Sequence, residues 1–102
     1  MIKAVINTKK LIGNTLDSRD EAGKLFAYVN ANYEHPVSVI FDFEDVDFMS
    51  RSFADEFHKL QLKWFSEYHT SIEIDNAAVQ VLYQLDIKRR QSNFQGNSHR
   101  ML

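Results

Sequence analysis

The hydrophobic residues of this chain change their spacing repeatedly, from every second residue to every third or fourth residue and back. Alternate spacing indicates a half-buried strand, whereas spacing of three and four indicates one face of a helix. Short segments with strand character lie at residues 2–6, 37–43 and 70–74, and a segment with helical spacing follows each of them. Strands separated by helices are expected to pair in parallel, so the pattern predicts a small α/β domain. We expect a mixed or mostly parallel sheet of about four strands, packed by about three helices.

The first helical segment begins at Ser18. Its apolar stripe consists of Ala22, Leu25, Phe26, Val29 and Tyr33. Ser18 and Glu21 have the spacing of a capping box, in which each side chain satisfies a free backbone N–H at the helix start. His35-Pro36 predicts the end of the segment, because Pro cannot continue a helix. Residues 11–16 are interpreted as a second short strand, forming a hairpin with the first.

The strand at residues 37–43 is apolar on both faces, because Ile40 lies between Val39 and Phe41. A strand of this kind is usually central and covered on both sides. Residues 44–47 then form an acidic turn, after which Phe48-Met49 is expected to return to the core.

The longest helical segment begins at residues 50–52, where Ser52 and Asp55 have the spacing of a cap. Its stripe is formed by Phe53, Phe57, Leu60 and Trp64, widened by Phe65 and Tyr68. A third helix is expected after Asp75 or Asn76, either of which can cap it. Its apolar residues are Ala78, Val81, Leu82 and Leu85.

Composition narrows the class of protein. A chain of 102 residues is the size of one domain, which we place at residues 1–90, with a mobile, polar and basic tail at 91–102. The sequence contains no Cys, which excludes disulfides and thiolate chemistry and favours a reducing compartment, so a cytoplasmic location is expected. There is neither a signal peptide pattern nor an apolar run long enough to span a membrane. The net charge of −2 gives no general attraction to nucleic acid or to a membrane surface.

Few residues carry the spacing of a catalytic or metal site. No two histidines are three or four residues apart, the glycines are isolated, and a nucleophile elbow is lacking. We therefore expect no cofactor and no catalytic residues. The acidic residues alternate along one segment and could together hold a hard cation such as magnesium, although a solvated loop is the simpler interpretation. These residues are Asp42, Glu44, Asp45 and Asp47.

The segment from Phe41 to Phe57 is the strongest local feature. A buried strand leads through an acidic turn into a helix start, where unsatisfied backbone N–H groups favour an anion. This arrangement predicts a recognition site at the start of the longest helix.

The same segment resembles bacterial STAS-like domains of unknown function, which are distant relatives of anti-sigma-factor antagonists. The central resemblance is carried by Asp42-Phe43, Val46, Phe48 and residues 52–57. It extends to Leu16, Ser18-Arg19, Glu21-Ala22, Ile74, Asn76 and Val79, and so covers about residues 12–88. The resemblance implies a STAS-like fold and a regulatory domain that docks a protein partner, which in the antagonist relatives is commonly a histidine-kinase-like ATPase.

In those antagonists a similar segment leads into an Asp-Ser-Ser-Gly turn whose first Ser is phosphorylated. When the two are aligned at Phe48-Met49, Ser50 stands at the Asp, Arg51 at the acceptor Ser and Ser52 at the second Ser. The usual acceptor is absent, so Ser52 and Ser50 are the alternative candidates for phosphorylation.

We therefore expect a non-enzymatic regulatory module that binds a protein partner. The expected contact residues are Ser50, Arg51, Ser52, Asp55 and Glu56. One alternative is a small metal-assisted hydrolase or phosphotransfer enzyme that uses the acidic residues and Arg51. Another is a nucleic-acid accessory protein that uses the basic residues Lys88, Arg89, Arg90 and Arg100. The sequence leaves homo-oligomerisation open.

Overall fold

The computed structural model describes residues 3–34 and 36–86, so the predicted tail at residues 91–102 lies outside the described residues, as does His35. The strands are β1 (Lys3–Asn7), β2 (Thr15–Leu16), β3 (Ser38–Asp42), β4 (Phe48–Met49) and β5 (Ser71–Asp75). The helices are α1 (Thr8–Leu11), α2 (Arg19–Asn32), α3 (Arg51–Tyr68) and a helical segment at residues 79–86, called helix 79–86 below. None of the helices in these ranges is long and apolar enough to cross a membrane.

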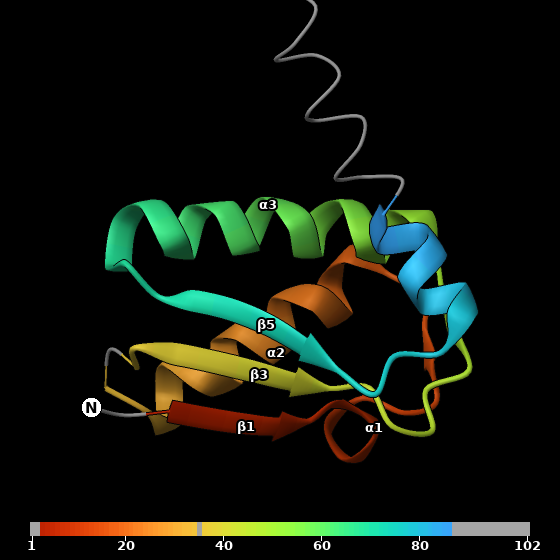
Figure 1. Cartoon of the computed structure of the whole chain (residues 1–102), viewed down its shortest axis with the longest axis horizontal. Helices are drawn as coiled ribbons and strands as arrows, with labels where there is room; N and C mark the ends of the chain where they lie inside the picture. Colours follow the sequence, from red (N-terminus) through yellow and green to blue (C-terminus); the bar gives the residue numbers. More distant parts are fainter. Residues whose placement is uncertain (1–2, 35, 87–102) are drawn as a thin grey trace, which may run out of the picture.

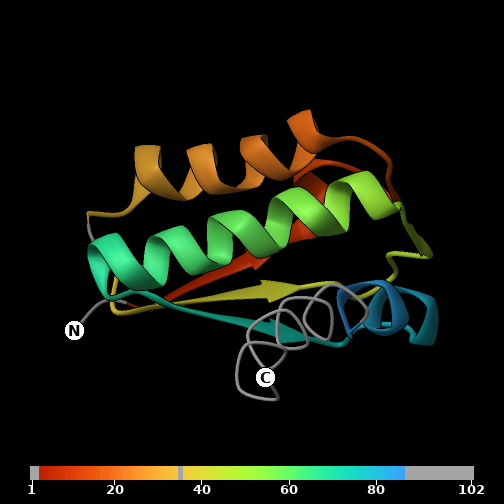
Figure 2. The ribbon, with the colours of Figure 1, turned by 90° about the horizontal axis from the view of Figure 1, so that it is seen from above.

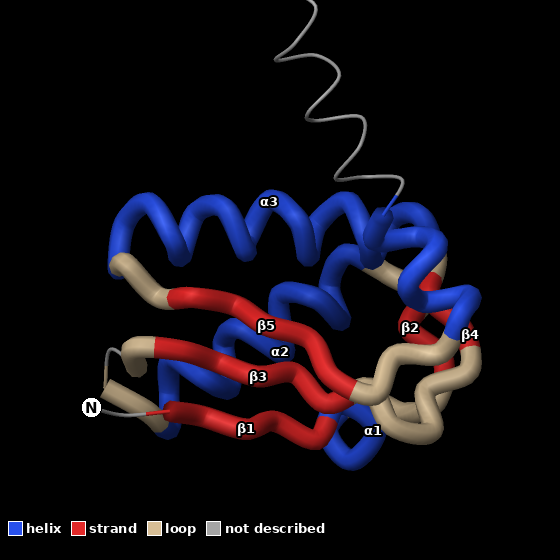
Figure 3. The backbone as a smooth tube through the Cα atoms, in the orientation of Figure 1, coloured by secondary structure: helices blue, strands red, loops and turns tan. Residues whose placement is uncertain are grey.

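The described strands form two parallel sheets, which confirms the predicted α/β class with parallel strands (Figures 1 and 3). The larger sheet has the order β1-β3-β5, and the smaller one pairs β2 with β4. The described residues therefore hold two sheets of three and two strands and four helices, instead of one sheet of four. The predicted hairpin with β1 is wrong. The chain leaves β1 through α1, whose first turn is capped by Asn7, and β2 pairs with the distant β4.

Helices α2 and α3 lie side by side on one face of the larger sheet (Figure 2). The Phe41 ring of β3 lies 5.1 Å from Phe26 of α2 and 5.4 Å from Phe57 of α3, measured between ring centroids. No described element covers the opposite face, where Val5 is 62% exposed, so the prediction that the central strand is covered on both sides is wrong (Figure 2). Ile40 is only half-buried on this open face, where its neighbours across the sheet are Val5 and Glu73.

The capping box at the start of α2 is confirmed. The Ser18 hydroxyl accepts a hydrogen bond from the Glu21 amide at 3.3 Å, and the Glu21 carboxylate accepts one from the Ser18 amide at 3.0 Å. Ala22, Leu25, Phe26 and Val29 are buried, as their spacing predicts. The helix ends at Asn32, before the predicted stop at Pro36, because Tyr33 is already extended.

The apolar stripe of α3 is narrower than its sequence suggests. Phe53, Phe57 and Trp64 are buried, whereas Phe65 is 65% exposed and Tyr68 is 42% exposed. The expectation that the last two widen the stripe is therefore wrong. Each α-helical residue turns about 100° from the one before, so Phe65 already leaves the core-facing direction of Trp64. The core expectation for β4 holds for Met49 and fails for Phe48, whose side chain is 41% exposed.

Helix 79–86 begins later than either predicted cap. Its first helical hydrogen bond runs from the Leu82 amide to the Ala78 carbonyl at 2.9 Å, so neither Asp75 nor Asn76 caps it. Asn76 instead has a left-handed backbone with φ of 54°. Val81 is fully buried, but Leu82 of the predicted stripe is 47% exposed.

Candidate functional site at the start of α3

The start of α3 is fastened to the start of α2, and each helix follows one strand of the β2–β4 pair (Figure 3). The Ser50 amide donates a hydrogen bond to the Leu16 carbonyl at 2.7 Å. The Ser50 hydroxyl donates another to the Asp17 carbonyl at 2.8 Å. The two helix starts therefore form one surface, although the sequence separates them by more than thirty residues.

Ser50, and not Ser52, is the N-cap of α3. Its hydroxyl oxygen accepts a hydrogen bond from the Phe53 amide at 3.1 Å, while its backbone is still extended. The prediction that Ser52 caps the helix is therefore wrong. Because β4 pairs with β2 up to Met49, the chain is held extended until Ser50, and Ser52 falls within the first helical turn, where it is exposed.

The two predicted acidic contact residues already have a cationic partner. Arg19 of α2 contacts the carboxylates of Asp55 at 2.5 Å and Glu56 at 3.7 Å. Lys59 lies 3.2 Å from Asp55. The hydrogen bond from Arg19 and the charge of Lys59 lower the pKa of Asp55, and the same contact with Asp55 raises the pKa of Arg19. Asp55 therefore stabilises the fold above its unfolded-state pKa, and this contribution is lost as the pH falls through its folded-state pKa.

The contact of Arg19 with α3 was not predicted from the sequence. The residue stands inside the Ser18–Glu21 capping motif, and that motif carries no information about a contact 36 residues away. Only the packing of α2 on α3 brings it to Asp55.

Arg51 occupies the first helical position of α3 and is exposed. Asp47 and Asp55 lie four residues before and four residues after Arg51 in the sequence, and both carboxylates are engaged elsewhere. Asp55 pairs with Arg19, and Asp47 accepts a hydrogen bond from the Asn14 side chain at 3.2 Å. Among the described residues, Arg51 makes no ion pair or side-chain hydrogen bond, so its guanidinium faces solvent at the positive end of the helix.

The acidic residues of the turn do not converge as the metal alternative requires. Asp42 lies in β3 and accepts hydrogen bonds from the Glu44 amide at 2.9 Å and the Asn76 side chain at 3.0 Å. Asp45 has a left-handed backbone with φ of 63°, and Asp47 is held by Asn14. Within the described ranges, no three acidic or histidine side chains are grouped so that they could hold a metal ion.

Because Ser50 caps α3 and Ser52 does not, alanine variants of these two residues form a matched pair. Ser50→Ala is expected to lower the free energy of unfolding by about 1 kcal/mol, because the Phe53 amide loses its acceptor. Ser52→Ala is expected to change it by less than about 0.5 kcal/mol, since Ala is a good helix former and Ser52 is exposed. Urea denaturation of both variants measures the difference. Equal losses would show that Ser50 does not cap the helix.

Searches against protein-family models, curated proteins and solved structures find no match to this chain.

Proposed function

We propose that this chain is a non-catalytic, STAS-like regulatory module that binds a protein partner through the start of α3. The partner would present a carboxylate or phosphate to Arg51, and a histidine-kinase-like ATPase is the partner class that the sequence resemblance implies. A cytoplasmic location is part of this proposal and is supported by the cysteine-free composition.

The proposal rests on Arg51, which is exposed and makes no ion pair among the described residues. Its guanidinium is exposed beside the free backbone N–H groups of an 18-residue helix, and neither Asp47 nor Asp55 neutralises it. A helix start and an Arg both favour an anion, and Arg can bind a carboxylate or phosphate through two hydrogen bonds. The exposed aromatic ring of Phe48 precedes it in β4 and adds apolar area for a protein partner.

The geometry also distinguishes the two candidate phosphorylation sites. The Ser50 hydroxyl is used twice, as donor to Asp17 and as acceptor from Phe53, so phosphorylating it would remove the cap. Ser52 is exposed and has no capping role. A phosphate on Ser52 would sit in the first turn, where the helix dipole favours negative charge, next to Arg51 in sequence. We therefore assign regulation by phosphorylation to Ser52, with Arg51 neutralised in the modified form.

The test is the variant Arg51→Glu, with Lys63→Glu as a control. Lys63 is also exposed on α3, and the control makes the same change of charge about three turns further along the helix. The partner is identified by affinity pull-down, and the fold of each variant is checked by circular dichroism. Arg51→Glu is expected to weaken partner binding at least tenfold, or about 1.4 kcal/mol. Lys63→Glu should bind within about twofold of the parent chain.

Unchanged affinity in a folded Arg51→Glu protein would remove the start of α3 from the interface. An equal loss in both variants would show that only the overall charge of the chain matters.

A further inference from the structure

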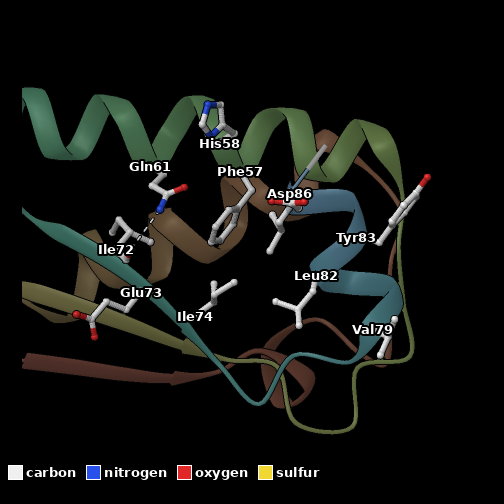
Figure 4. Close-up of a pocket in the computed structure, with 11 residues that line it drawn as sticks. Phe57, His58, Gln61, Ile72, Glu73, Ile74, Val79, Leu82, Tyr83 and Asp86 are labelled. Carbon is white, nitrogen blue, oxygen red and sulfur yellow. Dashed lines mark hydrogen bonds between the residues drawn. The ribbon is translucent and has the colours of Figure 1, made fainter. Parts of the chain in front are cut away.

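A second surface, separate from Arg51, lies between α3, β5 and helix 79–86. These elements enclose a half-open pocket of about 670 Å³. Figure 4 shows Leu82 of helix 79–86 and Ile74 of β5 at the pocket, with the buried ring of Phe57 between α3 and β5 at its base. The volume falls within the range of about 300–1,000 Å³ that is typical of ligand pockets.

The wall contributed by helix 79–86 is unusually apolar for a surface. Val79 is 84% exposed, Leu82 is 47% exposed and Tyr83 is 64% exposed, and all three line the pocket. Exposed apolar residues that gather at one opening mark an interaction site more often than scattered ones do.

The floor of the pocket is the edge of the larger sheet. β5 pairs with β3 on one side only, and the backbone groups of Ser71, Glu73 and Asp75 face β3 in this register. In a parallel ladder the intervening residues, Ile72 and Ile74, therefore turn their N–H and C=O groups outward. The Ile72 carbonyl accepts a hydrogen bond from the Gln61 side chain at 3.2 Å, which closes one end of the pocket (Figure 4). Ile74 lies beyond that closure and lines the pocket.

The charged side chains that line the pocket in the described part of the chain are acidic. Glu73 and Asp86 line it, and no Lys or Arg does so in the described part of the chain. The strand itself has the sequence Ser-Ile-Glu-Ile-Asp, with its acidic side chains exposed. Antiparallel pairing of two β5 strands from two copies of the chain would bring these like charges together, which is unfavourable. The complementary occupant is therefore cationic and is not a second copy.

We propose that this pocket binds an extended segment of a partner protein. An apolar side chain of that segment enters between Phe57 and Leu82, a neighbouring Lys or Arg faces Glu73, and its backbone bonds to the outward groups of Ile74. Adding a strand to an exposed sheet edge is a common mode of peptide recognition, in which the backbone bonds give affinity and side-chain pockets give specificity. This inference goes beyond the proposed function, because it does not use the start of α3.

The experiment selects random peptides of about seven residues on the full-length chain by phage display. Enriched peptides are expected to combine large apolar residues with Lys or Arg and, when added to the labelled chain, to shift the amide signals of Ile72, Ile74 and Leu82. Glu73→Lys should weaken the selected peptides by roughly fivefold or more, because it reverses the charge at the pocket. Glu67→Lys makes the same change on an exposed part of α3 outside the pocket and should leave binding within about twofold.

Arg51→Glu should also leave peptide binding unchanged, so a failure of the proposed function and a failure of this inference can be told apart. Enrichment of no peptide, enrichment of acidic or uncharged peptides, or signal shifts confined to other elements would each overturn the inference. Two further results would assign the pocket to other occupants. One is displacement of the selected peptides by a synthetic peptide of residues 87–102, which would make the chain's own end the occupant. The other is self-association of the chain that blocks peptide binding, which would make a second copy the occupant.

Discussion

Replacing Phe57 by Ala is expected to lower the free energy of unfolding by about 3 to 5 kcal/mol, the usual range for emptying an aromatic site in a core. The Phe57 side chain is 1% exposed. Its ring centroid lies 5.4 Å from Phe26 and from Phe41, 5.9 Å from Phe43 and 6.0 Å from Phe53. The ring thus joins α2, α3 and the sheet, so its removal leaves a cavity among four aromatic neighbours.

The matched control is Phe65→Ala, the same substitution on the same helix. Phe65 is 65% exposed, so this variant is expected to lose less than about 1 kcal/mol. Chemical denaturation followed by circular dichroism measures both. A loss below about 1 kcal/mol at Phe57 would mean that α3 presents a different face to the sheet.

Gln80→Ala is expected to lower the free energy of unfolding by about 2 kcal/mol, although the change favours helix formation locally. The Gln80 side chain bonds to the backbone of Met49 in both directions. Its oxygen accepts from the Met49 amide at 2.7 Å, and its nitrogen donates to the Met49 carbonyl at 3.0 Å. The Gln80 side-chain amide therefore makes the two hydrogen bonds to β4 that a neighbouring strand would make. Removing it leaves two backbone groups without partners in a part-buried place.

The control for Gln80 is Gln84→Ala, one turn further along helix 79–86. The Gln84 side-chain oxygen is buried and has no hydrogen-bond partner among the described residues, so its removal is expected to change stability by less than about 0.5 kcal/mol. Equal losses in the two variants would show that the effect comes from the helix and not from the bonds to Met49.

The candidate site was predictable in position and less so in detail. The acidic turn and the apolar period that follows place Ser50, Arg51 and Ser52 at a helix start, because both signals lie within a few residues of that point. The sequence could not choose between Ser50 and Ser52 as the cap, since both are good caps. The pairing of β4 with β2 decides it, because the Ser50 amide is bonded to Leu16 and its hydroxyl to Asp17. The neutralisation of Asp55 by Arg19 likewise depends on the packing of α2 on α3.

The pocket was not predictable. Val79 and Leu82 fit a helical stripe, and nothing local indicates that they stay exposed while Val81 is buried. The bonds between Gln80 and Met49 orient helix 79–86 in this way, and they join residues 31 positions apart.

The amino-acid sequence alone was enough to predict the order of the large elements and most of the residues that α2 and α3 bury. It also determined the parallel pairing of β1, β3 and β5. These features depend on periodicity and on local capping, as in Ser18 with Glu21, or on the general rule that strands joined through helices pair in parallel. Three features could be seen only in the folded chain: Ile40 faces an open side of the sheet, β2 pairs with β4, and Arg51 makes no ion pair among the described residues. Each of these depends on which distant residues share a layer, because burial and charge pairing are properties of neighbours in space.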